Sequence, residues 1–213
     1  MDRESLLIEG MISDIISYGL YDEVVFDAMR NIKRSIFAQS YPVEVVYRDR
    51  PLDIGYGQTI SQPFTVAFML HELQLKKGMS VLEIGSGSGW VIALIKEIVG
   101  DGVVVGVEIE PHLAAESRER LRELDIDAEI ISGDGSIGCR AKAPFDRILV
   151  SAACPSIPKK LYSQLKAGGC IVAPVGKDVQ VMVRATFNKQ GIDLEKLGEF
   201  RFVPLRGRFG FQR

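Results

Sequence analysis

From Gly78 onward the chain alternates short apolar segments with helical segments, and this alternation leaves few folds open to it. The apolar segments are nearly continuous, which is typical of parallel strands that are buried on both faces of a sheet. Strands that are joined by helices form a parallel sheet with helices on both sides. We expect strands at 79–84, 103–108, 128–131, 145–151 and 170–174, and helices at 90–99, 111–124 and 158–165.

The end of the chain departs from this alternation. Residues 166–169 read as a turn, and two further strands, at 179–187 and 194–203, follow each other without an intervening helix. Consecutive strands without a crossover connection pair antiparallel. The sequence therefore predicts an α/β fold with a doubly wound sheet that is mostly parallel and has an antiparallel edge.

The first 77 residues are predicted to form a helical cap on this core. Apolar residues recur at helical spacing on either side of Gly19, which indicates two helices. Residues 35–61 are rich in proline, glycine and tyrosine and are predicted to be an irregular loop. Pro63 is placed to begin a third helix. We expect a single domain over 1–213, in which segment 1–77 packs on a core of residues 78–213.

The chain carries 26 basic and 28 acidic residues, which gives a formal net charge of −2. Binding to nucleic acid through its phosphates needs a basic surface, so nucleic acid is not an expected partner. Arginines gather near the end of the chain, and we interpret this basic segment as a solvated tail. They are Arg201, Arg206, Arg208 and Arg213.

The three cysteines have no metal-binding spacing, and they predict free thiols in a reducing compartment. The chain starts with charged residues and contains no run of about 18 apolar residues, so neither a secretory signal nor a membrane span is expected. We expect a cytoplasmic protein that has no membrane partner and no bound metal.

Gly85, Gly87 and Gly89 lie between the first predicted strand of the core and the helix that follows it. Glycines at this place let the backbone come close to a nucleotide, which the N–H groups at the helix start can face. A glycine turn without a ligand is the alternative. A dinucleotide fingerprint needs its third glycine where this chain has Trp90, which argues against NAD and FAD. The chain also lacks a phosphate-binding loop ending in Gly-Lys-Ser/Thr, which argues against ATP hydrolysis.

Acidic residues stand at the ends of three predicted strands. Glu83 precedes the glycine loop, and Glu108 ends the next strand, where ribose hydroxyls are held in this class of fold. Asp134 lies between two glycines after the third strand, where an adenine amino group would need an acceptor. An exposed strand-end charge is the alternative for Glu108, and a turn aspartate is the alternative for Asp134. Together the three residues predict a site for an adenosyl ligand without pyrophosphate.

Residues 81–89 closely resemble the cofactor motif of class I methyltransferases, which bind S-adenosylmethionine on a Rossmann-like sheet. Residues 54–63 are more specific, because the run Gly57-Gln58-Thr59-Ile60-Ser61 within them resembles the signature of protein-L-isoaspartate O-methyltransferases. The resemblance to that family extends from about residue 47 onward. It continues, in the family's order, at 133–135, 143–148, 165–169 and 202–205.

The resemblance implies an enzyme that moves a methyl group from S-adenosylmethionine to the free carboxylate of L-isoaspartyl residues in damaged proteins and peptides. It implies Ser61 as the catalytic residue, and Thr59, Ile60 and Ser61 as substrate-binding residues. Segment 1–77 would be the substrate side of the domain, and 78–213 its cofactor-binding core. The residues implied to hold the cofactor are Glu83, Gly85, Ser86, Gly87, Ser88, Gly89, Glu108, Ile109, Gly133, Asp134 and Gly135.

The implied chemistry suits this chain, because a carboxylate is already ionised near neutral pH and its methylation needs no strong general base. Family members usually carry Phe-Val-Pro where this chain has Phe37-Ala38-Gln39, a departure that bears on peptide recognition. Two alternatives stay open: a class I methyltransferase with another substrate, and a module that binds the cofactor without catalysis. Ser61 also has an alternative role, because it stands where it could cap the helix that begins at Pro63.

Overall fold

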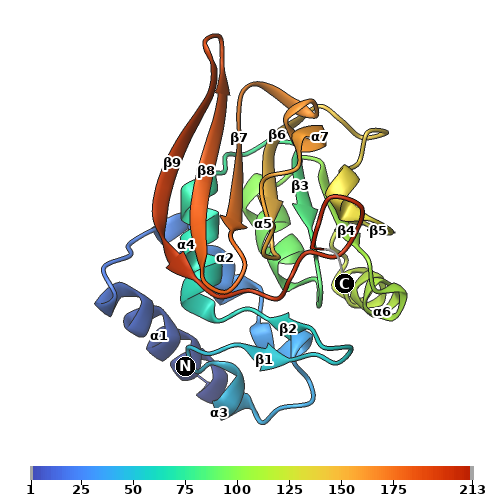
Figure 1. Ribbon diagram of the computed structural model, residues 1–213. Coiled ribbons are helices and arrows are strands. Elements are labelled where there is room, and N and C mark those ends of the chain that lie inside the picture. Colours follow the sequence, from blue (N-terminus) through green and yellow to red (C-terminus); the bar gives the residue numbers. More distant parts are fainter. Residues whose placement is uncertain (1, 212–213) are drawn as a thin grey trace.

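The computed structural model describes residues 2–211 and contains a seven-stranded sheet in the order β5-β4-β3-β6-β7-β8-β9 (Figure 1). All pairings from β5 to β7 are parallel, whereas β7 with β8 and β8 with β9 pair antiparallel. The predicted parallel sheet with an antiparallel edge is therefore confirmed. Its strands are β3 (Val81–Ile84), β4 (Val104–Glu108), β5 (Glu129–Ser132), β6 (Phe145–Val150), β7 (Leu165–Val175), β8 (Gln180–Asn188) and β9 (Gly191–Phe200).

The direction of winding switches between β3 and β6. From β3 the chain passes through α5 (Trp90–Val99) to β4 and through α6 (Pro111–Glu123) to β5, and then returns to the other side of β3 as β6. In doubly wound sheets, ligands bind outside the carboxyl ends of the strands at such a switch. The residues just beyond these ends are adjacent here, because the Ser151 N–H donates to the carbonyl of Ile84 at 2.8 Å.

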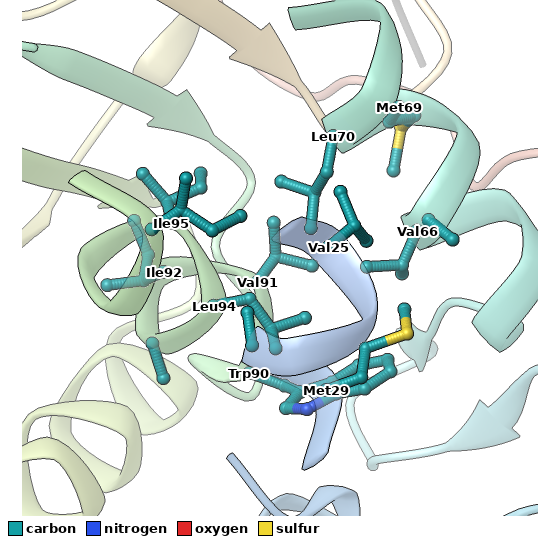
Figure 2. Close-up of a cluster of buried hydrophobic side chains, with 14 of the residues drawn as sticks. Val25, Met29, Val66, Met69, Leu70, Trp90, Val91, Ile92, Leu94 and Ile95 are labelled. Carbon is teal, nitrogen blue, oxygen red and sulfur yellow. The ribbon is translucent and has the colours of Figure 1, made fainter. Parts of the chain in front are cut away.

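One face of the sheet is covered by long helices. α4 (Pro63–Leu73) and α5 lie against it, α2 (Glu23–Asn31) packs on both, and α1 (Arg3–Ser17) packs on α2 and α4. The predicted helical cap is therefore confirmed, with its first two helices separated near Gly19. Figure 2 shows the buried side chains that join α2, α4 and α5, among them Val25, Met29, Val66, Met69, Leu70, Trp90, Val91 and Leu94.

The opposite face has a thinner cover, made by α7 (Lys159–Tyr162), the short 3-10 helix η2 (Gly135–Ile137) and loops. The helix predicted at 158–165 is wrong in length, because α7 ends at Tyr162 and Gln164 forms hydrogen bonds with residues outside the helix. Its carbonyl accepts from the Phe145 N–H at 2.8 Å, and its side-chain oxygen accepts from the Cys139 N–H at 2.8 Å.

The turn predicted at 166–169 is also wrong, since these residues belong to β7. They form an irregular stretch between two pairings with β6, that of Leu165 with Phe145 and that of Cys170 with Arg147. Gly168 has a φ of +78° within this stretch, which explains the local turn signal. Pairing with β6 on either side keeps the stretch in the sheet.

The segment predicted to be an irregular loop is wrong in part, because it holds short elements. These are η1 (Arg34–Phe37), α3 (Val43–Val46) and a hairpin of β1 (Leu52–Asp53) with β2 (Thr59–Ile60). At the tip of the hairpin the ring of Tyr56 stacks on that of His112, with 5.3 Å between their centroids. This contact ties the hairpin to the start of α6.

Arg34 holds this segment together. Its side chain is fully buried and donates to the carbonyl oxygens of Val46, Arg50 and Ser61, the last at 2.9 Å. The guanidinium also lies over the ring of Trp90, 5.3 Å from its centroid. Burial lowers the pKa of Arg34 to about 10, so the group remains charged at neutral pH. One cation therefore connects the cap, the Ser61 backbone and the start of α5.

We expect Arg34→Met to lower the free energy of unfolding by about 3 kcal/mol, because it leaves carbonyl groups without their donor in a buried place. Chemical denaturation monitored by circular dichroism would measure this change. Arg140→Met is the matched control, since Arg140 is exposed on the opposite side of the sheet. Equal stability of the Arg34 variant and the wild-type protein would show that the contacts with the carbonyl oxygens contribute little.

Candidate active site

A pocket lies at the carboxyl ends of β3, β4 and β6, where the topology predicts a ligand. We call it the strand-end pocket. Residues of the hairpin, of three strand ends and of the segment after β9 form its wall. They are Gln58, Thr59, Ile84, Gly85, Gly87, Val107, Glu108, Ile109, Gly135, Ser151, Ala152, Val203, Pro204, Leu205 and Arg206. The structure thus brings five of the predicted cofactor residues, Gly85, Gly87, Glu108, Ile109 and Gly135, together around one space.

Glu108 connects two of the loops that form this wall. One of its carboxylate oxygens accepts from the Gly87 N–H and the other from the Glu110 N–H, both at 2.9 Å. Gly87 has a φ of +51°, which allows its N–H to face the carboxylate in the tight turn after β3. Glu108 is only 3% exposed, so its charge faces the pocket rather than bulk solvent.

Glu83 lies directly behind the wall. One carboxylate oxygen accepts from the Ser151 hydroxyl at 2.6 Å, and the other is buried and has no hydrogen bond within residues 2–211. Burial, opposed by the hydrogen bond from Ser151 and assisted by the charge of Glu108, raises the pKa of Glu83 to about 8. A buried carboxylate with one free oxygen is suited to a cationic group.

The remaining predicted cofactor residues do not line the pocket. Ser86 and Ser88 are buried in the glycine loop, and Gly89 is the residue before α5. Asp134, next to Gly133, has both carboxylate oxygens in use: one accepts from the N–H and hydroxyl of Ser136, the other from the Arg208 N–H at 2.8 Å. Burial opposes ionisation of Asp134, yet these donors lower its pKa.

The segment after β9 crosses the carboxyl ends of the strands (Figure 1). Ala153 fixes it, by donating to the Val203 carbonyl at 2.8 Å and accepting from the Leu205 N–H at 2.7 Å. The interpretation of the terminal arginines as a solvated tail is wrong for Arg206, whose Nη2 atom is buried at the strand-end pocket, 4.0 Å from a Glu110 oxygen. Arg201 and Arg208 are exposed, and Arg213 lies outside the described residues.

A second pocket adjoins the first and contains Ser61, and we call it the Ser61 pocket. It shares Thr59, Ser151 and Val203 with the strand-end pocket. The Ser61 hydroxyl has no hydrogen bond within the described chain, and the alternative capping role is wrong. Gln62 is the residue before α4, and an oxygen of Asp49 accepts from the Phe64 N–H at 2.8 Å. The full lining is Pro51, Thr59, Ser61, Gln62, Thr65, Ser151, Arg201, Phe202 and Val203.

Ile60 and the segment Phe37-Ala38-Gln39, both singled out in the sequence, lie away from both pockets. Ile60, unlike its chain neighbours Thr59 and Ser61, is only 4% exposed and packs in the core, so its placement does not support contact with a substrate. In the segment that departs from the usual Phe-Val-Pro, Phe37 and Ala38 are buried in the same core. Of the two positions that differ from that motif, Ala38 is therefore in the core and Gln39 is exposed, and neither lines a pocket.

Sequence reasoning missed Ser151, Ala152 and the segment 203–206 as wall residues. Ser151 could have been found, because it directly follows a predicted strand and strand ends form the site in this fold class. Residues 202–205 continue the family resemblance, but no local pattern placed the segment 203–206 at the pocket, which it reaches through its bonds to Ala153. None of the described helices is long and apolar enough to cross a membrane, and no group of His, Cys, Asp or Glu within residues 2–211 could hold a metal ion.

A doubly wound sheet with a glycine loop and acidic residues near two neighbouring strand ends defines a nucleotide-binding fold, and its match to solved methyltransferase structures makes it a methyltransferase fold. The sequence model of the protein-L-isoaspartate(D-aspartate) O-methyltransferase family matches residues 7–210. The chain belongs to this family, and the resemblance found in the sequence is confirmed.

Individual relatives agree over nearly the whole chain. Protein-L-isoaspartate O-methyltransferase 2 of Archaeoglobus fulgidus is 46% identical over 88% of this chain and 87% of its own length. A solved protein-L-isoaspartate O-methyltransferase structure aligns with a TM-score of 0.87 at 30% identity, over 95% of this chain and 67% of that one. A Plasmodium falciparum structure, described as such a methyltransferase in complex with S-adenosyl-L-homocysteine, aligns with a TM-score of 0.82 at 27% identity, over 97% and 99% of the two chains.

Proposed function

We propose that this protein transfers a methyl group from S-adenosylmethionine to the free carboxylate of L-isoaspartyl residues in proteins and peptides. The observation that carries the proposal is the pair of adjoining pockets. One has the acidic strand ends that suit an adenosyl cofactor, the other has the free Ser61 hydroxyl, and the two share Thr59, Ser151 and Val203 as a common wall. Family membership supports the choice of substrate.

The strand-end pocket has groups that fit each part of the cofactor. Glu108 is placed to accept from the ribose hydroxyls, with lone pairs left over from its two backbone bonds. Glu83 would hold the cationic amino group, since one of its oxygens lacks a partner. Asp134 and the glycines beside it would border the adenine, although Asp134 is already bound by Ser136 and Arg208.

The transfer is an in-line displacement. A carboxylate oxygen of the substrate forms a bond to the methyl carbon, while the bond from that carbon to the sulfonium breaks and its electrons stay on sulfur. The products are a neutral methyl ester and a neutral thioether, and no proton moves. The protein therefore has to orient the carboxylate and remove its water, for which a hydroxyl donor such as Ser61 suffices.

The proposal also covers the organisation and location of the protein. Segment 1–77 would be the substrate side and 78–213 the cofactor core of one domain. Each segment also contributes a residue to the pocket of the other, because Thr59 lines the strand-end pocket and Arg201 lines the Ser61 pocket. A cytoplasmic location is supported by three free cysteines, all of them buried, which suit a reducing compartment.

We expect cofactor binding near pH 7 to release protons from Glu83. In the free protein its pKa of about 8 keeps Glu83 largely protonated at this pH, and a cationic amino group beside it favours the ionised form. Titration calorimetry with S-adenosylhomocysteine in buffers of different ionisation enthalpy measures this release, which should approach about one proton per cofactor. Glu83→Gln should show none, and an equal release from the variant would contradict the assignment.

The same shift affects stability. The pKa of Glu83 lies at about 8 in the folded chain and at its ordinary value of 4.5 when unfolded, so the folded state binds the extra proton. Its contribution to the free energy of unfolding therefore falls as the pH rises from 4.5 to about 8, and it is constant above that range.

The proposed function is tested with two peptides that differ only in an isoaspartyl or an aspartyl linkage, incubated with labelled S-adenosylmethionine. We expect label on the isoaspartyl peptide alone. Equal labelling of the aspartyl peptide would contradict the proposed substrate. Binding of the cofactor without labelling of either peptide would favour a module that has lost catalysis.

A further inference from the structure

Among the described residues that line the Ser61 pocket, Arg201 is the only one with an ionised side chain. The other polar side chains of the lining are neutral hydroxyl and amide groups that can donate hydrogen bonds. They are Thr59, Ser61, Gln62, Thr65 and Ser151, but Ser151 already donates to Glu83 and Gln62 to Asp49, so the hydroxyls of Thr59, Ser61 and Thr65 are the donors left for a ligand among the described residues. A pocket with several neutral donors and one guanidinium is suited to an anion, and above all to a carboxylate, which the guanidinium can bind through two parallel hydrogen bonds.

The guanidinium of Arg201 is free to take a ligand. It has no hydrogen bond and no ion pair with any residue from 2 to 211, although acidic residues lie close by on β9. Arg184 on the neighbouring strand differs in this respect, because it pairs with Glu72 at 2.7 Å and also with Glu195. The charge of Arg201 is therefore not neutralised by the fold.

The backbone that carries Arg201 is firmly held. The N–H of Phe202 donates to the side-chain oxygen of Gln180 at 2.7 Å, and Gln180 is only 1% exposed. One residue further, the Val203 carbonyl accepts from the Ala153 N–H. A side chain with an unpaired charged end on a firmly held backbone is the arrangement expected of a residue that recognises a ligand rather than one that stabilises the fold.

We propose that Arg201 binds the free carboxylate of the substrate and thereby selects the unmethylated form. This inference rests on the proposed function, since it takes the Ser61 pocket as the substrate site. The carboxylate is an anion and its methyl ester is neutral, so transfer of the methyl group removes the attraction to the guanidinium. Arg201 accordingly strengthens the binding of the substrate and not that of the product, which favours release of the ester.

Arg201 takes no part in the bonds that form and break, and its place at the edge of the pocket lets it attract the carboxylate without entering the reaction. Its removal should therefore affect binding rather than the chemical step. We expect Arg201→Gln to raise KM for an isoaspartyl peptide about threefold to fivefold, the upper range for an exposed charged contact, with kcat changed by less than about twofold. Arg201→Lys should recover part of the loss, since it keeps the charge without the paired donors.

The decisive experiment is a double-mutant cycle on binding. The affinity of the complex with S-adenosylhomocysteine is measured by calorimetry for an isoaspartyl peptide and for the same peptide with its free carboxylate converted to a carboxamide. Wild-type protein should prefer the carboxylate peptide over the carboxamide peptide by about the same threefold to fivefold, and Arg201→Gln should show no preference. Arg140→Gln, which removes an exposed charge remote from the pocket, should behave as the wild type.

Several results would overturn the inference. The first is a wild-type protein that binds the carboxylate and carboxamide peptides equally well. The second is an Arg201→Gln variant that still prefers the carboxylate peptide, and the third is a variant that loses the same affinity for both peptides. The last would indicate a structural role for the side chain. A wild-type protein that binds the carboxylate peptide through Arg201 but transfers no methyl group would instead contradict the proposed function, so the two failures are distinguishable.

Discussion

Replacing Ser61 by alanine should reduce kcat on an isoaspartyl peptide about 100-fold, because the carboxylate is then no longer held in line with the methyl group. The affinity for S-adenosylhomocysteine should not change, because Ser61 lines only the pocket on the substrate side of the shared wall. The serine also has no hydrogen bond within the described structure that its loss would break. The fold should therefore tolerate the substitution.

Steady-state kinetics with labelled cofactor, together with calorimetric binding of S-adenosylhomocysteine, separate these effects. Thr65→Val is the matched control, since Thr65 contributes a hydroxyl to the same pocket from α4. It should lose much less activity. An unchanged kcat in the Ser61 variant would remove the serine from the catalytic role.

Replacing Glu108 by alanine should weaken the binding of S-adenosylhomocysteine about 100-fold, because a buried carboxylate that faces the ribose hydroxyls is lost. The variant also frees the N–H groups of Gly87 and Glu110, which both donate to this side chain. Glu108→Gln separates the two effects. It keeps an acceptor for the loop but loses the charge, so its binding should lie between those of the alanine variant and the wild type.

Glu129→Gln controls for the loss of a carboxylate on a neighbouring strand, where Glu129 pairs with Lys142 at the surface. Its affinity should equal that of the wild type. Binding of S-adenosylhomocysteine by the Glu108→Ala variant with unchanged affinity would mean that Glu108 only supports the loop.

The parallel part of the sheet was predictable because the strands β3 to β6 are short and mostly apolar, and because the connections between them are local. The errors arose where distant contacts override local signals. Residues 166–169 have the composition of a turn, but pairing of β7 with β6 on both sides keeps them in the sheet. The region 35–61 looks irregular, yet the buried Arg34 orders it through carbonyl groups as far away as Ser61.

The site residues likewise fall into those that local sequence features predict and those that distant contacts bring in. Gly85, Gly87 and Glu108 were predictable, since a glycine loop and a strand-end acid are local features with a known role in this fold class. Arg201 and Arg206 were not, because a basic segment near the end of a chain is usually solvated. Only the bonds of the segment after β9 to Ala153 bring Arg206 to the cofactor side.

The central claim is that the cofactor and the isoaspartyl carboxylate occupy adjoining pockets that share Thr59 and Ser151. A crystal structure of this protein with S-adenosylhomocysteine and an isoaspartyl peptide tests it most directly. We expect the cofactor in the strand-end pocket beside Glu108, and the free carboxylate in the Ser61 pocket within hydrogen-bond distance of Ser61. A peptide carboxylate bound outside the Ser61 pocket, or a cofactor away from Glu108, would contradict the account.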